Sequence, residues 1–201
     1  RFAECGLKLE LKDVRPKFKK IPLKLRDDIH PLFYQNEAIK NIIEKNCLIK
    51  LRCGKGKTIL FLLAVAQMKL KTLILVRTKI LLKQWVDSIK KVFDIKDEDI
   101  GIISGDKKTD GLITVATEQS LIGLSRSEKR KLGEKYGHLC LDEAHELPAE
   151  CYSELAQYFK SFRINGLSAT PFREDKLDPV IKLYIGPIVG IDDLGDFTTQ
   201  V

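Results

Sequence analysis

Short apolar runs alternate with stretches of helical spacing along most of the chain. The strand-like runs are CLIKL, TLILV, IGIIS, LITVAT, HLCLD and INGLSAT. Between them, ILLKQWVDSIKKVF, PAECYSELAQYF and others repeat apolar residues at the period of an α-helix. KLELK, near Leu7 to Lys12, is a further candidate strand, and PLFYQNEAIKNIIEKN is a further candidate helix.

This β-α-β alternation predicts an α/β fold built on one mostly parallel sheet. Short strands that are almost wholly apolar are typical of a sheet with helices on both faces. Ligands of such a sheet bind at the carboxyl ends of its strands. The residues that follow the apolar runs are therefore the candidates for chemistry.

Length and composition allow one sizeable core, or one core with a small appendage, because the chain has 201 residues and 44% apolar content. The longest apolar stretches, such as ILFLLAVA, are much shorter than the roughly 20 residues of a membrane span, so no membrane partner is expected. The five cysteines are odd in number and form no C-x-x-C pair. They predict free thiols in a reducing, intracellular compartment rather than zinc or disulfides.

The net charge of +7 suggests a polyanionic partner, because a basic surface releases counterions when it binds nucleic acid. Part of the excess is local, since RPKFKKIPLKLR (Arg15 to Arg26) carries six basic residues and no acidic one. Lysine-rich segments are also common as solvated surface. This segment could be a solvated linker, a DNA contact or the joint to a preceding domain.

The stretch LRCGKGKTIL (51–60) lies between a strand-like run and a helical run, and its spacing indicates a phosphate-binding loop. Gly54 and Gly56 allow a tight loop whose N–H groups, with that of Lys55, can point at phosphate oxygens. The next helix adds the positive end of its dipole. Lys57 would neutralise the β and γ phosphates, and the hydroxyl of Thr58 would bind Mg²⁺.

The loop departs from the G-x-x-x-x-G-K-[ST] pattern in one place, because Leu51 stands where the pattern has glycine. A glycine-rich strand-to-helix turn without a ligand is the alternative interpretation. A second acidic motif, described next, weighs against that alternative.

The run HLCLDEAH ends an apolar strand on two acids. Asp142, at the carboxyl end of the strand, could hold Mg²⁺, and Glu143 could polarise the attacking water. The alternative is a solvated acidic turn before a helix that has Pro148 at its first position. Two signals of phosphate chemistry, in this order and on these elements, favour the catalytic interpretation.

These motifs, with LSATPFRED downstream, resemble the first RecA-like domain of a superfamily 2 helicase or translocase with a DEAH box (142–145). The nearest type is the XPB-like DNA helicases, with relatives among restriction-enzyme motor subunits and viral helicases. The resemblance implies a RecA-like P-loop NTPase that uses ATP and Mg²⁺ and moves on DNA. An RNA helicase, or a nucleic-acid-binding module without turnover, is the alternative.

The resemblance assigns further roles near the nucleotide. Gln35 would be the glutamine that reads adenine. Ser168 and Thr170, in the SAT motif, would couple hydrolysis to movement through His145. Lys57 and Glu143 would complete the catalytic set with Asp142.

Other segments resemble those that touch the nucleic-acid backbone without reading its sequence. They are RTKILLKQW (77–85) and ATEQSL (116–121), and the Arg-Glu-Asp element at 173–175 resembles one that is typical of the XPB-like branch. The candidate contacts in them are Arg77, Thr78, Lys79, Thr117, Gln119 and Arg173.

Some positions depart from the family or have a simpler interpretation. Leu32 and Phe33 replace the usual Arg-Pro pair before the Tyr-Gln, and Arg77 stands where proline is frequent. Trp85 lies on the apolar face of its helix and is expected in the core. His30 and His138 have no evident partner in the sequence, and the pair at 107–108 could be a plain surface turn.

The expected domain organisation is a basic N-terminal segment or linker at 1–28, a RecA-like domain at 29–191, and the start of a linker at 192–201. About thirty residues follow the SAT motif, which is too few for another β-α-β domain. In this superfamily ATP lies between two RecA-like domains, the second of which supplies arginines. We therefore expect the amino-terminal motor half of a longer, monomeric protein.

Overall fold

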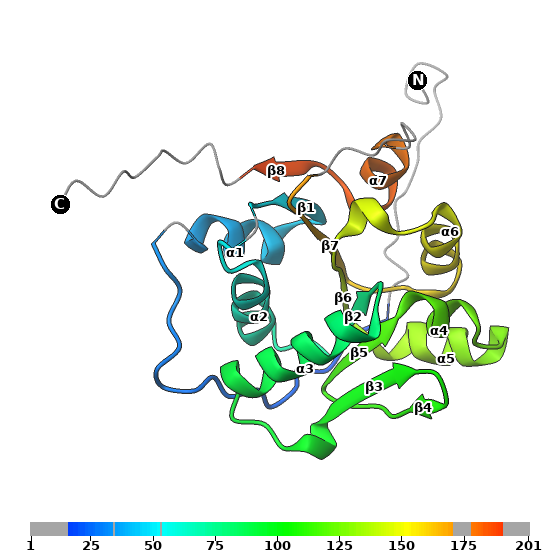
Figure 1. The fold of residues 1–201 in the computed structure, drawn as a ribbon, viewed down its shortest axis with the longest axis horizontal. Coiled ribbons are helices and arrows are strands. Elements are labelled where there is room, and N and C mark those ends of the chain that lie inside the picture. The colour runs from blue at the N-terminus through cyan, green and yellow to red at the C-terminus, as the bar shows by residue number, and fades with distance from the viewer. Residues whose placement is uncertain (1–15, 34, 53, 171–177, 191–201) are drawn as a thin grey trace.

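The computed structural model describes residues 16–33, 35–52, 54–170 and 178–190. Its centre is an eight-stranded sheet in the order β4-β3-β5-β2-β6-β7-β1-β8 (Figure 1). Every neighbouring pair is parallel except β3 and β4, which are antiparallel. The predicted mostly parallel α/β sheet is thereby confirmed. The strands are β1 (Cys47–Lys50), β2 (Thr72–Val76), β3 (Ile100–Ser104), β4 (Lys107–Lys108), β5 (Ile113–Thr117), β6 (His138–Leu141), β7 (Arg163–Ser168) and β8 (Ile188–Gly190).

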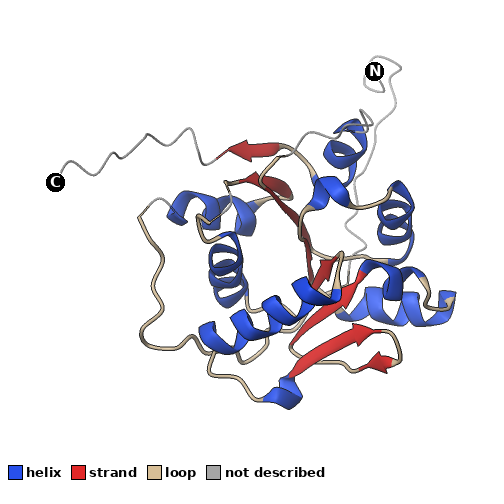
Figure 2. Cartoon of the chain, viewed as in Figure 1, coloured by secondary structure: helices blue, strands red, loops and turns tan. Residues whose placement is uncertain are grey.

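Helices lie on both faces of the sheet, as the alternating pattern predicted (Figure 2). Helices α1 to α3 cover one face and α4 to α7 cover the other. The helices are α1 (Gln35–Glu44), α2 (Lys57–Met68), α3 (Lys79–Val92), α4 (Glu118–Ile122), α5 (Arg126–Lys135), α6 (Ala149–Tyr158) and α7 (Asp178–Ile185), with short 3₁₀ helices η2 (Asp97–Asp99) and η3 (Ala144–Glu146).

The sheet separates two apolar cores, because successive residues of a strand point to opposite faces. Ile49 and Ile74 pack with α1, α2 and α3, whereas their neighbours Leu48 and Leu73 pack on the other side with α4, α6 and α7. All four side chains are buried. This two-sided burial is why the strands read as continuous apolar runs.

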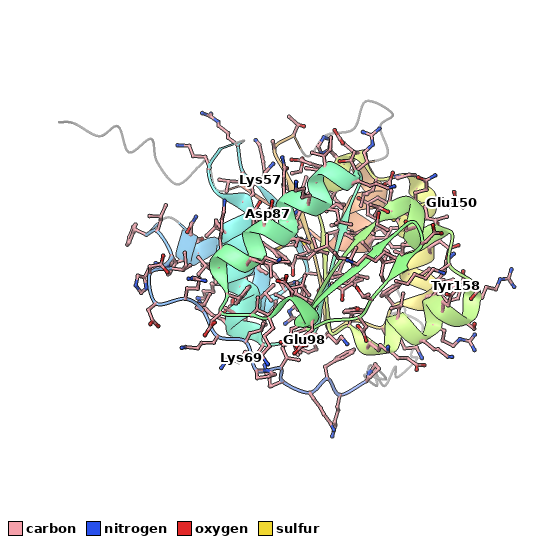
Figure 3. All side chains as sticks on the ribbon, turned by 60° about the horizontal axis from the view of Figure 1, so that its bottom comes forward. Lys57, Lys69, Asp87, Glu98, Glu150 and Tyr158 are labelled. Atoms are coloured by element: carbon pink, nitrogen blue, oxygen red, sulfur yellow. The ribbon has the colours of Figure 1, made fainter. Side chains whose placement is uncertain are left out.

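The basic segment near the N-terminus docks against the amino ends of the strands. Lys20 forms a bridge with Leu70, just before β2, and Leu25 forms one with Phe93, just after α3. The side chain of Leu23 is buried in the core on the α1–α3 face. In Figure 3, this end of the molecule, marked by Lys69 and Glu98, lies opposite the end that carries Lys57.

The position of this segment separates two groups of basic residues. Arg77 follows the carboxyl end of β2, whereas Lys20 lies beside the residues that precede the same strand. One nucleic-acid surface built from both groups would have to wrap around the sheet. The two groups therefore have to be tested separately.

Several elements differ in detail from the sequence-based expectation. Helix α6 begins at Ala149, with Pro148 as its extended N-cap residue rather than its first residue. Two short helices, α4 and α5, follow β5, and Ser125 begins the second with a capping box to Glu128. The candidate strand near Leu7 lies outside the described residues. Within the described part of the chain, each helix is too short or too polar to cross a membrane.

Candidate functional site

The phosphate-binding loop has the backbone that the glycines predicted. Gly54 and Gly56 have φ angles of +79° and +75°, a left-handed conformation that other residues rarely adopt. Helix α2 begins at the next residue, Lys57, so its first N–H groups face the loop. A Cβ at Gly56 would lie 3.3 Å from Nε2 of Gln35, a tight contact that adds to the strain of the positive φ angle.

Lys57 and Glu143 meet across the loop. The Nζ atom of Lys57 donates a hydrogen bond to Oε1 of Glu143 over 2.7 Å, and both side chains are largely shielded from solvent. Glu143 has φ +43° and ψ +52°, which is a left-handed conformation at a residue with a Cβ. Such a conformation is unfavourable by about 1–3 kcal/mol and is typical of functional sites. The predicted phosphate-binding lysine and the predicted catalytic acid are therefore adjacent.

Asp142 is held rigidly beside this pair. Its Oδ2 atom accepts a hydrogen bond from Nε1 of Trp85 over 2.7 Å, and its Oδ1 accepts one from the backbone N–H of Glu143 over 3.1 Å. Only 8% of Asp142 is exposed, and this burial raises the pKa of its carboxyl group. Trp85 was expected only as a core residue. Its second role was not visible in the sequence, because its partner lies 57 residues away.

The residues present suit a magnesium nucleotide. The open glycine backbone and Lys57 can hold phosphates, while the Thr58 hydroxyl and the Asp142 carboxylate are oxygen ligands of the kind that Mg²⁺ prefers. Mg²⁺ is usually bound by one or two such protein ligands together with substrate phosphates. The set is therefore suited to a metal that arrives with its nucleotide.

His145 lies between the acidic motif and the SAT motif. Its Nδ1 atom is 2.8 Å from Oγ of Ser168, and its Nε2 atom is 3.3 Å from Oγ1 of Thr170. The same Nδ1 lies 3.6 Å from Oε2 of Glu143. The three residues of the expected coupling group are thus in contact, next to the expected catalytic acid, although their role stays a prediction.

Gln35 begins α1 and is buried, with 3% of its surface exposed. Its Oε1 atom accepts a hydrogen bond from the backbone N–H of Leu32 over 3.0 Å. Leu32 and Phe33 themselves are exposed, Phe33 by 85%. The side chain of Gln35 thus lies between the loop before α1 and the phosphate-binding loop, and its role in reading adenine stays a prediction.

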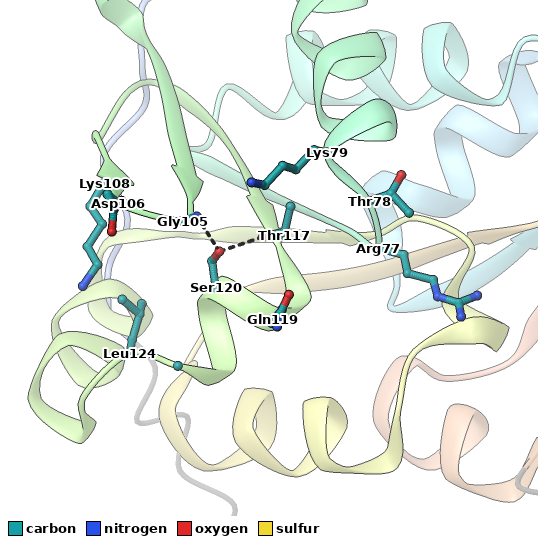
Figure 4. A pocket seen from close by; sticks show the side chains of 11 residues that line it. Arg77, Thr78, Lys79, Gly105, Asp106, Lys108, Thr117, Gln119, Ser120 and Leu124 are labelled. Carbon is teal, nitrogen blue, oxygen red and sulfur yellow. Dashed lines mark hydrogen bonds between the residues drawn. The ribbon is translucent and has the colours of Figure 1, made fainter.

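Most of the expected nucleic-acid contacts line one open cavity of about 860 Å³ (Figure 4). They come from the carboxyl ends of β2 and β5 and from the helices that follow. The predicted residues in the lining are Arg77, Thr78, Lys79, Thr117 and Gln119. The Thr78 hydroxyl also caps α3 by accepting a hydrogen bond from the N–H of Leu81. Arg173 lies outside the described residues.

The turn between β3 and β4 adds residues that the sequence did not suggest. The Oγ atom of Ser120 accepts hydrogen bonds from the N–H of Gly105 over 2.9 Å and from Oγ1 of Thr117 over 2.8 Å, which ties the turn to α4. Lys108 lies in the cavity wall on the two-residue strand β4, and its exposed side chain pairs with Glu128 over 3.0 Å. A role for Lys108 beyond that of a surface turn stays a prediction. The basic pair beside a glycine was the signal that could have suggested it.

Comparison with known proteins identifies the family. Residues 28–173 match the family described as type III restriction enzyme, res subunit. The chain belongs to this family. It is also 42% identical over 166 residues to a DNA 3'-5' translocase XPB2 of Sulfurisphaera tokodaii, covering 82% of this chain and 36% of that protein. The predicted membership of superfamily 2, in its XPB-like branch, is confirmed.

Solved structures of helicases share the fold. The UvsW helicase of bacteriophage T4 superimposes with a TM-score of 0.69 at 18% identity, covering 94% of this chain and 74% of that chain. The Hef helicase domain of Pyrococcus furiosus gives a TM-score of 0.66 at 25% identity, covering 80% of this chain and 37% of that chain. The predicted RecA-like helicase fold is confirmed. The chain spans only 26–36% of the length of three similar curated relatives.

Proposed function

We propose that this chain is the ATP-binding motor domain of a DNA helicase or duplex-DNA translocase. The observation that carries the proposal is the Lys57–Glu143 contact of 2.7 Å across a left-handed glycine loop. This contact supports the proposal because a cation suited to phosphates lies next to a carboxylate suited to orienting water. Backbone strain of this kind clusters at active sites, which supports a catalytic role for Glu143.

Each residue of the site has a distinct task in this proposal. The loop amides and Lys57 bind the phosphates, and Thr58 and Asp142 hold Mg²⁺. Bound Mg²⁺-ATP supplies the phosphoryl group whose transfer to water releases the free energy for movement. Glu143 orients that water and accepts its proton.

The coupling group then relates the nucleotide to the DNA. His145 touches Glu143 on one side and the SAT hydroxyls of Ser168 and Thr170 on the other. A change at the γ phosphate would therefore reach β7 through a few direct contacts. This arrangement supports the assignment of Ser168 and Thr170 to coupling.

The cavity that contains Arg77, Lys79 and Lys108 is the proposed DNA track. Its basic and hydroxyl side chains suit backbone phosphates and carry little base-reading chemistry. Relatives named DNA 3'-5' translocase and DNA 3'-5' helicase support DNA over RNA and a 3'-5' direction. We propose that the protein acts as a monomer inside the cell, where both ATP and DNA are found.

A second RecA-like domain in the same polypeptide completes the proposed motor. It would supply arginines that stabilise the transferred phosphoryl group, an effect on the order of 10³- to 10⁵-fold in rate. These 201 residues alone should then bind nucleotide weakly and show little DNA-stimulated hydrolysis. Joining the native downstream segment should restore activity.

The decisive experiment is an ATPase assay of the complete protein with duplex DNA, with RNA and without nucleic acid. We expect hydrolysis that duplex DNA stimulates. Glu143→Gln should bind ATP and lose most of its turnover, whereas Glu150→Gln, an exposed acid in the first turn of α6, should behave like the wild type. Stimulation by RNA alone would favour an RNA helicase, and binding of DNA without turnover would favour a binding module.

A further inference from the structure

The wall of the proposed DNA cavity is joined directly to the acidic motif by an ion pair. The Nη1 atom of Arg77 donates to Oε2 of Glu146 over 3.0 Å. Arg77 lies at the carboxyl end of β2 and in the cavity lining, while Glu146 ends the 3₁₀ helix η3 that follows Glu143. Both side chains are partly exposed, at 53% and 40%, so a ligand in the cavity can reach the pair.

A second carboxylate lies near the same guanidinium. Glu118 begins α4, and its Oε2 atom is buried without a hydrogen-bond partner among the described residues. Burial raises the pKa of Glu118, the charge of Arg77 lowers it and the charge of Glu146 raises it. Arg77 therefore offsets the repulsion between two acids, and its withdrawal would push Glu146 away from Glu118.

The other oxygen of Glu146 faces the coupling group. Its Oε1 atom lies 3.9 Å from Nε2 of His145, which is near but too far for a hydrogen bond. His145 in turn contacts Ser168 over 2.8 Å. A continuous series of contacts thus leads from Arg77 through Glu146 and His145 to the SAT motif.

We propose that Glu146 is a positioning residue that reports DNA binding to the nucleotide site. Without DNA, Glu146 holds Arg77. A backbone phosphate competes for the guanidinium, because its two oxygens can pair with it bidentately, whereas Glu146 holds Arg77 by a bond to one oxygen. Glu146, released and repelled by Glu118, then moves toward His145.

Two features of the pair favour this competition. Exposed ion pairs contribute little to stability, so the pair can be opened by a phosphate. Arg77 also stands where the resembling family often has proline, which has no guanidinium to offer. The link rests on the proposed function, because it requires DNA in the cavity.

The test measures DNA affinity in the complete protein, with and without a non-hydrolysable ATP analogue. A fluorescent duplex is titrated at low salt against wild type, Glu146→Gln, Arg77→Gln and the double variant. Glu146→Gln should tighten nucleotide-free DNA binding about two- to fivefold, because a competitor of phosphate is lost. The ratio of DNA affinities with and without the analogue should move toward one, since coupling between two ligands is reciprocal.

The double variant and a matched control make the test specific. In the Arg77→Gln background, Glu146→Gln should add no further change, because the pair is already broken. Glu150→Gln removes the same charge from an exposed position of α6 and should leave the affinity ratio as in the wild type.

The possible failures can be told apart. If Glu146→Gln matches Glu150→Gln, or has the same effect with and without Arg77, the link is wrong and the proposed function stands. If the wild-type protein does not bind DNA at all, the proposed function is wrong and the link falls with it.

Discussion

Trp85 Nε1 donates a hydrogen bond to Oδ2 of Asp142 over 2.7 Å, which connects the middle of α3 to the end of β6. The indole is buried and packs edge-to-face on Phe61, with ring centroids 6.0 Å apart. The apolar core on the α1–α3 face thereby fixes the orientation of the expected metal ligand. The side chain of Trp85 therefore both packs in the core and orients Asp142.

We expect Trp85→Phe to shift the pH dependence of magnesium binding. The indole hydrogen bond lowers the pKa of Asp142 against the larger effect of burial, so its loss should raise that pKa further. Mg²⁺ needs the ionised carboxylate, so Mg²⁺-dependent nucleotide binding should be lost at a higher pH on acidification. A titration with a fluorescent ATP analogue at several pH values measures this. The loss of the bond should also reduce stability by about 1–3 kcal/mol.

Phe61→Leu is the control for this experiment, because it disturbs the packing of Trp85 without removing the hydrogen bond. Phe61→Leu should reduce the stability of the protein without shifting the pH dependence of Mg²⁺-dependent nucleotide binding. An unchanged profile in Trp85→Phe would contradict a role for the indole in tuning Asp142.

Lys57→Ala should weaken Mg²⁺-nucleotide binding by about tenfold or more. A hydrogen bond to a charged group contributes about 1.5–3 kcal/mol, and 1.4 kcal/mol corresponds to a factor of ten. The fold should persist, because Lys57 lies at the start of α2 and outside the two apolar cores. Lys40→Ala, at an exposed position of α1, is the matched control for nucleotide titration. Equal affinities in the two variants would contradict the assignment of Lys57.

DNA affinity should fall linearly with salt on a double-logarithmic plot. Lys108→Ala should reduce the magnitude of the slope by about 0.9, the value for one lost phosphate contact. Lys19→Ala removes the same charge from the basic segment at the opposite end of the sheet and should leave the slope unchanged. Binding measured at several salt concentrations decides between them. If Lys19→Ala changed the slope more than Lys108→Ala, the DNA-binding surface would lie at the other end of the sheet.

The buried imidazole of His138 should make the stability of the protein decrease in mild acid. It is fully buried, and burial lowers its pKa to about 3, although its Nε2 donates a hydrogen bond to Oδ1 of Asn165 over 3.0 Å. The unfolded chain, with a pKa near 6.5, binds the proton more readily. Stability from this residue is thus complete above about pH 6.5 and is lost as the pH falls toward 3.

Between pH 7 and pH 5 the expected loss from His138 is about 2 kcal/mol. Urea unfolding at the two pH values should therefore show a smaller decrease in His138→Gln than in the wild type. In His30→Gln, which changes an exposed position, the stability should decrease between the two pH values as much as in the wild type. Equal pH dependence in all three proteins would show that the buried imidazole is not responsible.

The local pattern was sufficient for the fold class. Runs such as TLILV form strands that are buried on both faces, because helices cover both faces of the sheet. The short strand β4 and the strand β8 were not expected. Two or three residues of edge strand carry no periodicity, so only pairing with a neighbour defines them.

The site was predictable where residues adjacent in sequence act together. The glycine loop with Lys57, and the pair Asp142 and Glu143, are local motifs whose chemistry follows from their order. His138 is the opposite case, since it was treated as a residue without a partner. Its partner Asn165 lies on the neighbouring strand β7, which no spacing along the chain could indicate.

The sequence by itself thus determined the sheet, the phosphate loop and the acidic motif, because each depends on periodicity or on a few neighbouring residues. The tertiary structure alone decided that Trp85 orients Asp142, that Arg77 pairs with Glu146, and that Lys108 joins the cavity wall. Each of these depends on which strand ends lie side by side. That order is set by the packing of helices on both faces, and it brings together residues far apart in the chain.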